Sequence, residues 1–350
     1  MKFSIFDHLD KRDEPLAKTY EDRLECIRTA EELGFYCYHL AEHHGTPLGM
    51  APSPGLFLAA AARETSKIKL GPLNYVLPLY HPVRLIEEIC MLDNLTKGRL
   101  QIGLGRGVSP IEVGFFGVKG EDTREMYHEA LSILMKGFTA DRLNHDGKHY
   151  QIRNVPMEMR PVQLPHPPLW AGVGDVNSQR FAVRNGINPV ALGSVERVRK
   201  LVKFCREIWA EEKDSRERVT LKAEAPVIAS ARHILVAETD AEAETLARSA
   251  YQAWYGALSK LWAEQGMAVH TSVIYANYDE ARSLGTVVAG SPATVRDKLA
   301  QLIETCGFDF LIGEFTWGNL THSQEMRSLK LFGTEVMPAL AKLGGKVPVA

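Results

Sequence analysis

The sequence predicts an α/β protein whose fold is a (β/α)8 TIM barrel with insertions after strands 4 and 7. Short apolar runs alternate with amphipathic helical patterns along the chain, as in repeated strand and helix units. Two of these runs end in polar or glycine-flanked residues, at the strand ends where such folds bind ligands. The 350 residues exceed the roughly 250 of a typical barrel, so residues 1–350 are read as one enlarged domain.

The elements of the first third of the chain can be placed from their end signals. Helix 82–95 is the best defined, because Pro82 suits a first helical turn and Lys97 with Gly98 suits the end. Gly34 ends an earlier helix in the same way. The expected strands are 2–6, 35–41, 67–76 and 100–104, and the other expected helices are one running to about 33 and one over 56–64.

The pattern continues in the rest of the chain with two interruptions. Residues 141–167 contain several prolines and the turn-forming run HDGKHY, so we expect an insertion with a small hairpin. Residues 257–289 have weak periodicity, and we expect a long irregular segment that forms a mobile lid. The stretch 108–123 is also expected to be irregular. Expected strands cover 167–174, 187–192, 227–237 and 309–313, and expected helices cover 124–137, 178–185, 195–213, an Ala- and Glu-rich segment after 237, a segment opened by Ser291, and 323–343.

Composition and charge exclude several classes of function. A formal net charge of −2 provides no field that would gather a nucleic acid. The amino terminus becomes charged too early for a signal peptide, and the apolar run GLFLAAAA stops at Arg63, so we expect neither secretion nor membrane insertion. An odd number of cysteines without a CxxC pair favours a reduced, cytoplasmic protein without disulfides or a zinc cluster.

Arg106 is the strongest candidate for binding an anion. It follows the strand 100–104 and lies between Gly105 and Gly107, which would let a ligand approach the backbone. A guanidinium can bind two phosphate oxygens at once. The alternative is an ion pair at the barrel rim. The spacing GLGRGV does not match GxGxxG, so a Rossmann dinucleotide site is poorly supported.

A second possible anion site lies at Val173, Gly174, Asp175 and Ser178, where a strand meets a helix. Backbone N–H groups at the start of a helix, helped by a hydroxyl, could complete a phosphate cradle. An ordinary turn capped by Ser or Asp is at least as well supported by the spacing.

Glu42, His43 and His44 end the second expected strand. Neighbouring strand residues point to opposite faces, so we expect only one histidine to face the barrel mouth and no shared metal. A histidine at this position could act as a general base. Hydrogen bonding to loop backbone is an equally good interpretation. His8, after the first strand, could reach the same mouth.

Several longer stretches resemble one known family. They are AEHHG at 41–45, VLPLYHPVR at 76–84, LTKGRLQIGLGRG at 95–107, WY at 254–255 and KLFGTEVMPAL at 330–340. In the same order along almost the whole chain, they are similar to the α subunit of bacterial luciferase and its flavin-dependent monooxygenase relatives.

The resemblance implies a barrel that binds reduced FMN at its mouth. The reduced flavin would react with O2 to a flavin hydroperoxide, which attacks an aldehyde or another small, largely apolar substrate. The sequence contains no NAD(P)H fingerprint, so a separate NAD(P)H:flavin reductase would supply the reduced flavin. The resemblance also suggests a homodimer formed through the helices after strands 2 and 3. Residues 257–289 correspond to the family's mobile loop, which would keep water from the hydroperoxide.

Roles carry over to individual residues by motif. His43 corresponds to the catalytic histidine of the family, and Arg106 to the arginine that binds the phosphate. Gly174, Asp175 and Ser178 fall on the phosphate cradle. Leu73 and Asn74 correspond to a cis peptide bond, not involving proline, that lies beneath the flavin ring.

The chain also departs from the luciferase α subunits. Those subunits carry a reactive cysteine where this chain has Gly105, which argues against light emission. They carry a Glu-Ser pair where this chain has Gly174 and Asp175, so a carboxylate would lie near the phosphate. Two alternatives stay open: a deazaflavin-dependent oxidoreductase that transfers hydride without O2, and a non-catalytic flavin-binding partner subunit.

Overall fold

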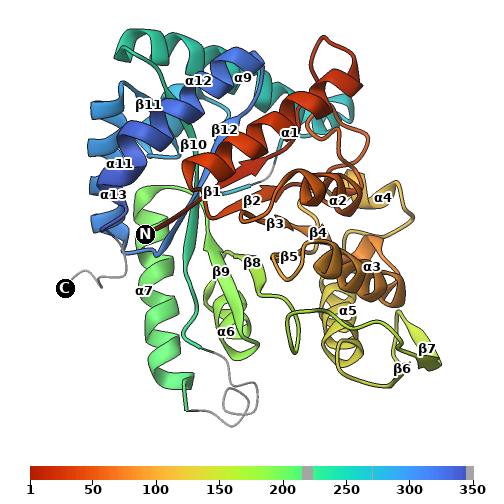
Figure 1. The fold of residues 1–350 in the computed structure, drawn as a ribbon. Helices are drawn as coiled ribbons and strands as arrows, with labels where there is room; N and C mark the ends of the chain where they lie inside the picture. Colours follow the sequence, from red (N-terminus) through yellow and green to blue (C-terminus); the bar gives the residue numbers. More distant parts are fainter. Residues whose placement is uncertain (215–223, 270, 344–350) are drawn as a thin grey trace.

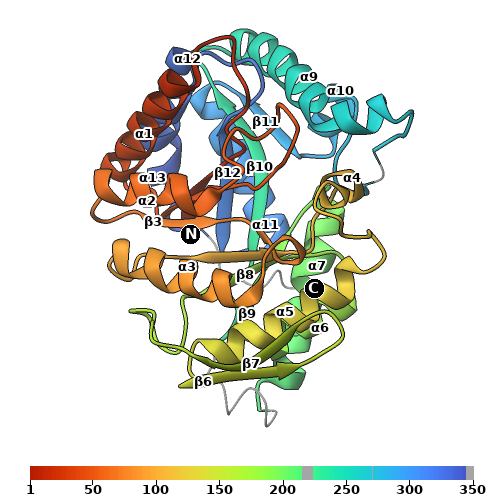
Figure 2. The same cartoon turned by 90° about the vertical axis from the view of Figure 1, so that its right-hand side faces the viewer.

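The main sheet closes into a barrel, which confirms the predicted fold class. The computed structural model describes residues 1–214, 224–269 and 271–343. Within these ranges, parallel strands follow one another around the barrel and helices cover the outside (Figures 1 and 2). The strands in ring order are β1 (Lys2–Asp7), β2 (Cys37–Leu40), β3 (Lys69–Pro72), β5 (Ile102–Gly105), β8 (Leu169–Val173), β9 (Ile187–Ala191), β10 (Ala229–Val236) and β12 (Phe310–Thr316), which pairs with β1.

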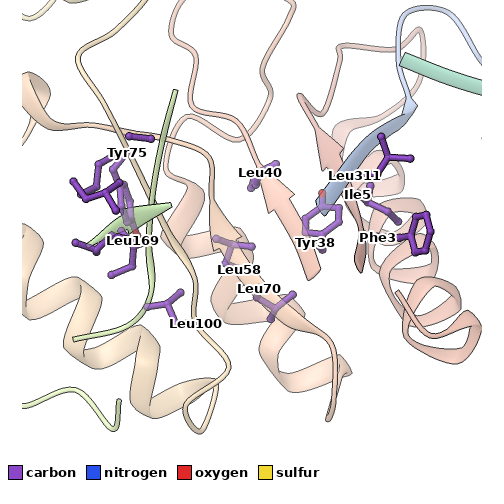
Figure 3. Packing of buried hydrophobic residues seen from close by; sticks show 14 of the residues in the cluster. Phe3, Ile5, Tyr38, Leu40, Leu58, Leu70, Tyr75, Leu100, Leu169 and Leu311 are labelled. Atoms are coloured by element: carbon purple, nitrogen blue, oxygen red, sulfur yellow. The ribbon is translucent and has the colours of Figure 1, made fainter. Parts of the chain in front are cut away.

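The joint between β3 and β5 closes the ring and is the shortest in it. It consists of one parallel bridge, between Leu70 and Leu100. The Leu70 N–H donates to the Arg99 carbonyl (3.1 Å), and the Gln101 N–H donates to the Leu70 carbonyl (2.9 Å). A Cβ on Gly71 would overlap the Gln101 carbonyl, so this approach requires glycine. Figure 3 shows Leu70 and Leu100 among the side chains of the apolar core.

The helices begin and end largely where the sequence signals predict. Gly34 ends α1 in the left-handed conformation (φ 85°), and Pro82 occupies the first turn of α3. The Ser291 hydroxyl caps α11. The bounds are α1 Leu16–Leu33, α2 Pro54–Glu64, α3 Pro82–Leu95, α4 Pro110–Gly114, α5 Thr123–Gly137, α6 Val176–Arg184, α7 Val195–Glu212, α9 Asp240–Glu264, α10 Tyr278–Ser283, α11 Pro292–Cys306, α12 His322–Leu331 and α13 Met337–Leu340, with a 3-10 turn at Leu77–Leu79. None of these helices combines the length and apolar character that a bilayer-spanning segment needs.

Residues 141–167 contain the small hairpin that the sequence predicts. Strands β6 (Arg142–Asp146) and β7 (Gln151–Pro156) pair antiparallel and lie outside the barrel sheet. Figures 1 and 2 show the hairpin below α5, at the opposite end of the molecule from α9 and α10. It therefore lies far from the segment that was expected to form a lid.

Residues 257–289 differ from the prediction of a continuous irregular segment. Helix α9 extends to Glu264 because its buried stripe continues through Leu258, Leu261 and Trp262. Helix α10 and strand β11 (Val287–Gly290) follow, and β11 pairs with the end of β10. Residue 270 lies outside the described residues. Whether this segment moves as a lid stays a prediction.

Three further boundaries differ from the sequence predictions. The stretch 108–123 contains α4, which the Ser109 hydroxyl caps and which Pro110 begins. The strand expected over 67–76 is interrupted between Leu73 and Asn74, and β4 (Tyr75–Val76) continues it along β5. The closing helix contains a π-helical turn, Phe332–Val336, between α12 and α13.

The barrel interior and the helix layer have separate apolar cores. Side chains that point outward from the strands pack with the helices in a large cluster that includes Leu169 and Ala171. A smaller cluster fills the barrel and includes Trp170, Val190 and Phe310. Because side chains alternate along a strand, residues two positions after an inner residue lie further along the interior, toward the mouth.

Candidate active site

Glycines leave space inside the carboxyl-terminal mouth of the barrel. Gly172 lies two residues after the inner Trp170 on β8, and Gly103 and Gly105 occupy the inner positions of β5. A Cβ on Gly172 would have no neighbour within 4 Å, so the mouth is open beside this strand. On β5 the Leu73–Asn74 segment fills the space beside the glycines, because a Cβ on Gly103 would come within 2.7 Å of Leu73, so the open room lies beside Gly172.

His43 is held by a carboxylate from α4. Its Nδ1 lies 3.2 Å from both carboxylate oxygens of Glu112, and the side chain is largely buried. The carboxylate can only accept, so we assign the ring proton to Nδ1. Nε2 has no hydrogen-bond partner among the described residues and is available as a proton acceptor. Sequence analysis missed Glu112, because 108–123 was expected to be irregular.

His44 is held by a different carboxylate. Its Nε2 lies 3.0 Å from Glu42, which also accepts the Val76 N–H (2.8 Å), and the His44 N–H donates to Glu112 (2.8 Å). Both histidines border one small pocket. The His43 ring lies 5.5 Å from the ring of His8, whereas the His44 ring packs at 4.7 Å from that of Phe116, so the expectation that only one histidine faces the mouth stays a prediction. Strand β2 ends at Leu40, before the pair, and strict alternation no longer applies there.

Arg106 and His43 belong to the same mouth. Gly107, the residue after Arg106, lines the pocket that His43 borders. The Arg106 side chain is exposed and makes no hydrogen bond or ion pair with any described residue. The alternative of an ion pair at the rim is therefore not supported, and the guanidinium is free to bind an anion.

The peptide bond between Leu73 and Asn74 is cis, as the resemblance implies. It follows β3 and lies against β5, where a Cβ on Gly105 would come within 2.9 Å of the Asn74 amide nitrogen. The Asn74 Oδ1 is buried and has no hydrogen-bond partner in the described structure. A ligand that donates a hydrogen bond would satisfy this oxygen.

The residues of the possible phosphate cradle form the N-terminal cap that the sequence left open as the other interpretation, and phosphate binding beside it stays a prediction. The Asp175 carboxylate accepts the Ser178 N–H (2.8 Å), and the Ser178 hydroxyl accepts the N–H groups of Gly174 and Asp175 (both 3.1 Å). These hydrogen bonds hold the pKa of Asp175 below its usual range, with the Ser178 N–H as the largest cause. Val173 ends β8 just before them. Arg197 donates to the Gly174 carbonyl (2.9 Å) and adds a cation beside the cap.

Sequence reasoning also missed a buried cluster behind His43. Glu314 on β12 lies 2.6 Å from His8 Nδ1 and 3.0 Å from His233 Nε2. The sheet register explains this, because Glu314 pairs with Phe6 on β1 and with His233 on β10. The His8 and His43 rings are 5.5 Å apart. The described residues contain no group of three or more His, Cys, Asp or Glu side chains that could hold a metal ion.

Comparisons with known proteins agree with this geometry. A model of the luciferase-like monooxygenase family matches residues 1–309. The oxygenase component of flavin-dependent trigonelline monooxygenase from Acinetobacter baylyi is 30% identical, over 98% of this chain and 96% of that protein. The FMN complex of the oxygenating constituent of 3,6-diketocamphane monooxygenase from Pseudomonas putida has a TM-score of 0.77 at 22% identity, covering 97% and 98% of the two chains.

The same fold also occurs with a deazaflavin. The coenzyme F420-dependent tetrahydromethanopterin reductase from Methanopyrus kandleri has a TM-score of 0.69 at 19% identity, covering 96% of this chain and 98% of that one. Likeness at this level concerns the fold alone. The choice between FMN and a deazaflavin therefore depends on the residues that line the barrel mouth.

Proposed function

This chain belongs to the luciferase-like monooxygenase family, and on that premise we propose that it is an FMN-dependent monooxygenase that uses O2 to oxidise a small, largely apolar organic substrate. One observation carries the proposal: a histidine oriented by a carboxylate follows β2, and an unpartnered arginine follows β5, at the same carboxyl-terminal end of the barrel. The two groups would serve opposite ends of the cofactor, His43 beside the ring and Arg106 at the phosphate.

The residues of the mouth fit a flavin phosphate ester. Arg106 offers a free guanidinium for the phosphate, and the open space beside Gly172 offers room for a planar ring. The unpartnered Oδ1 of Asn74 could accept an N–H group of that ring. We place Ser178 at the edge of the proposed site, because its hydroxyl already accepts hydrogen bonds within the cap of α6. When bound, reduced FMN would supply the electrons that activate O2.

His43 would act as the base beside the reacting centre. The Glu112 carboxylate fixes the proton on Nδ1 and favours a positive charge on the ring when Nε2 takes a proton. Apolar side chains, among them Val76 and Val113, lie beside His43 and Glu112 and would border an apolar substrate bound in the mouth. Closure of residues 257–289 over the mouth would exclude water, as proposed for the corresponding loop.

The expected partners follow from the same comparison. The trigonelline relative is an oxygenase component, and we propose that this chain likewise receives reduced FMN from a separate reductase in the cytoplasm. We also propose a homodimer through α2 and α3, because Leu56 (78% exposed) and Met91 (56% exposed) lie on these helices. Sedimentation equilibrium tests this: the mass of one 39.0 kDa chain in solution would contradict the dimer.

The test of the function is turnover with a supplied reductase. The purified chain, NADH, FMN and a flavin reductase are mixed in air with aldehydes, cyclic ketones or N-methylated pyridine carboxylates, and products are analysed by mass spectrometry. We expect one oxygen atom from 18O2 in the product. Coenzyme F420 is titrated in parallel, because the fold also occurs with this cofactor. Tight F420 binding without FMN binding would favour the hydride-transferring alternative, and flavin binding without turnover would favour a non-catalytic subunit.

A further inference from the structure

Helix α9 contacts the chain segment that carries His43. Thr46 follows His43 by three residues, and its hydroxyl donates to the Ala257 carbonyl of α9 (2.9 Å). Thr46 is largely buried, so little water competes for this hydrogen bond. Leu48, two residues further along the chain, is buried in the apolar cluster that also contains Leu258 of α9. The segment after β2 is therefore attached to α9 by a hydrogen bond and by apolar packing.

The same helix contacts the segment that carries Glu112. Ile111 packs with Leu261 and Trp262 in a small apolar cluster that is separate from the cores of the barrel interior and the helix layer, and all three side chains are buried. Figure 2 shows α4 directly below the end of α9. Helix α4 has only five residues, too few for a helix to be stable alone, so its position depends on such contacts.

The two contacts lie one helical turn apart on α9. Ala257 and Leu261 are separated by four residues, so they lie on the same face of the helix. One turn of this face holds the segment of His43, and the next turn holds the segment of Glu112. Between the two segments, the Glu112 carboxylate accepts the His44 N–H (2.8 Å) and lies 3.2 Å from His43 Nδ1. Because 3.2 Å is the long end of the hydrogen-bond range, a small shift of either segment would break the contact with the ring.

Contacts at the rim of the mouth also join the two segments. The Phe116 ring lies 4.7 Å from the His44 ring, and a Cβ on Gly45 would come within 2.8 Å of the Phe115 ring. Phe115 is 57% exposed and Phe116 is 50% exposed, whereas Trp262 is only 4% exposed. The rim contacts therefore bury a smaller share of each side chain than the contact with α9, and we expect α9 to contribute more to the position of α4.

We propose, on the basis of the function proposed above, that the end of α9 holds His43 and Glu112 together and that Trp262 is a positioning residue of the base. Trp262 acts through Ile111 and Glu112 rather than on the substrate. The end of α9 belongs to the segment 257–289, which we expect to close over the mouth. The base is then oriented only while the mouth is covered, so proton transfer is restricted to the state from which water is excluded.

Hydrogen exchange of the full-length chain tests this role without flavin or turnover. The His44 amide donates to Glu112, whereas the Ala41 amide in the same segment donates to a carbonyl of β1 (2.9 Å) and is the internal control. We expect Trp262→Ala and Thr46→Val to raise the exchange rate of the His44 amide by roughly 10-fold or more and to leave that of Ala41 unchanged. Thr46→Val keeps the shape of the side chain and decides the question if Trp262→Ala does not fold. An unchanged rate at His44, or an equal rise at Ala41, in the folded variants would overturn the proposal.

Turnover of the variants separates positioning from packing. With any substrate found in the turnover experiment, Trp262→Ala should lower kcat by roughly 10-fold, less than removal of the base itself, and leave FMN affinity unchanged. Because Trp262 acts through Glu112, the double variant with Glu112→Ala should be no slower than Glu112→Ala alone. Trp209→Ala on α7 is the matched control, since it removes the same side chain from the helix layer and should keep wild-type kcat. Additive losses in the double variant would refute the positioning role and leave the monooxygenase function standing.

Discussion

Residues of the same type at the barrel mouth differ in the groups that they contact. Arg197 near the mouth donates to the Gly174 carbonyl, whereas Arg106 has no partner among the described residues. His43 and His44 are neighbours in the sequence, yet each is held by a different glutamate. Among the described residues of the mouth, Arg106 is therefore an unpaired cation, and His43 is an imidazole oriented by a carboxylate.

Arg106→Ala should weaken the binding of reduced FMN by about 2 kcal/mol, roughly 30-fold, because a charged hydrogen-bonding partner of the phosphate is lost. Anaerobic fluorescence titration measures the affinity. Riboflavin, which lacks the phosphate, should bind wild type and variant alike. Arg153→Ala on the exposed hairpin strand β7 is the matched control. Equal losses for FMN and riboflavin would remove the assignment of Arg106 to the phosphate.

His43→Ala should retain FMN and slow product formation by roughly 100-fold, the lower range for the loss of an acid or base. Glu112→Gln should slow it less, because the ring stays in place and only the stabilisation of its charged form is reduced. Product analysis after a fixed number of reductase turnovers gives the rates. Wild-type turnover by His43→Ala would return this residue to a structural role.

Sequence analysis found the site residues that a local pattern marks, and it missed those whose hydrogen-bond partners are far away in the sequence. His43 and Arg106 follow strands directly, so the local pattern predicts their position. Glu112 is 69 residues from His43, and Glu314 is 306 residues from His8. These pairs exist only after the barrel has closed, and no local pattern predicts which carboxylate reaches which histidine.

At the scale of elements, helix α6 shows how one motif can have two interpretations. The sequence left a phosphate cradle and an ordinary cap equally open at Asp175 and Ser178. The structure shows the cap, whose hydrogen bonds use the N–H groups of Gly174, Asp175 and Ser178. Long amphipathic helices were predicted well, since their stripe and end signals are local. Helix α4 has only five residues and was missed for lack of periodicity.

Asp175→Asn should keep the cap, because asparagine caps as well as aspartate, and should tighten FMN binding by roughly 2- to 5-fold if the phosphate binds beside α6. Asp175→Ala should cost about 1 kcal/mol of stability through loss of the cap. Urea unfolding and flavin titration separate the two effects. If Asp175→Asn changes FMN and riboflavin affinity equally, the phosphate does not bind beside α6.

At the scale of the whole molecule, the barrel encloses a neutral histidine. His39 on β2 is almost fully buried between Trp170 and Phe310, and burial lowers its pKa to about 3. The alternation of strands and helices predicted this barrel, but a histidine inside it could not be distinguished from one at its surface. Which side chains face the barrel interior is set by which strands become neighbours in the ring.

His39→Leu should make the protein less sensitive to acid. The pKa of His39 in the folded state lies below the ordinary histidine value of 6.5, so the unfolded chain binds the proton first on acidification and stability is lost as pH falls from 6.5 toward 3. Between pH 7 and pH 5 this site should remove about 2 kcal/mol from wild type and nothing from the variant. Urea unfolding at both pH values measures it. His145→Leu, on the hairpin, should behave like wild type.

The short joint between β3 and β5 has a dynamic consequence. One bridge joins β3 itself to β5, and β4 adds two pairs with the end of β5, whereas β1 and β12 pair along their full length. In native-state hydrogen exchange, the amides of Leu70 and Gln101 should therefore lose protection before those of β1. Asn74 and Arg106 lie beyond this bridge, next to the pairs of β4 with β5, so local unzipping that also opens those pairs would release a bound cofactor while the rest of the ring stays folded.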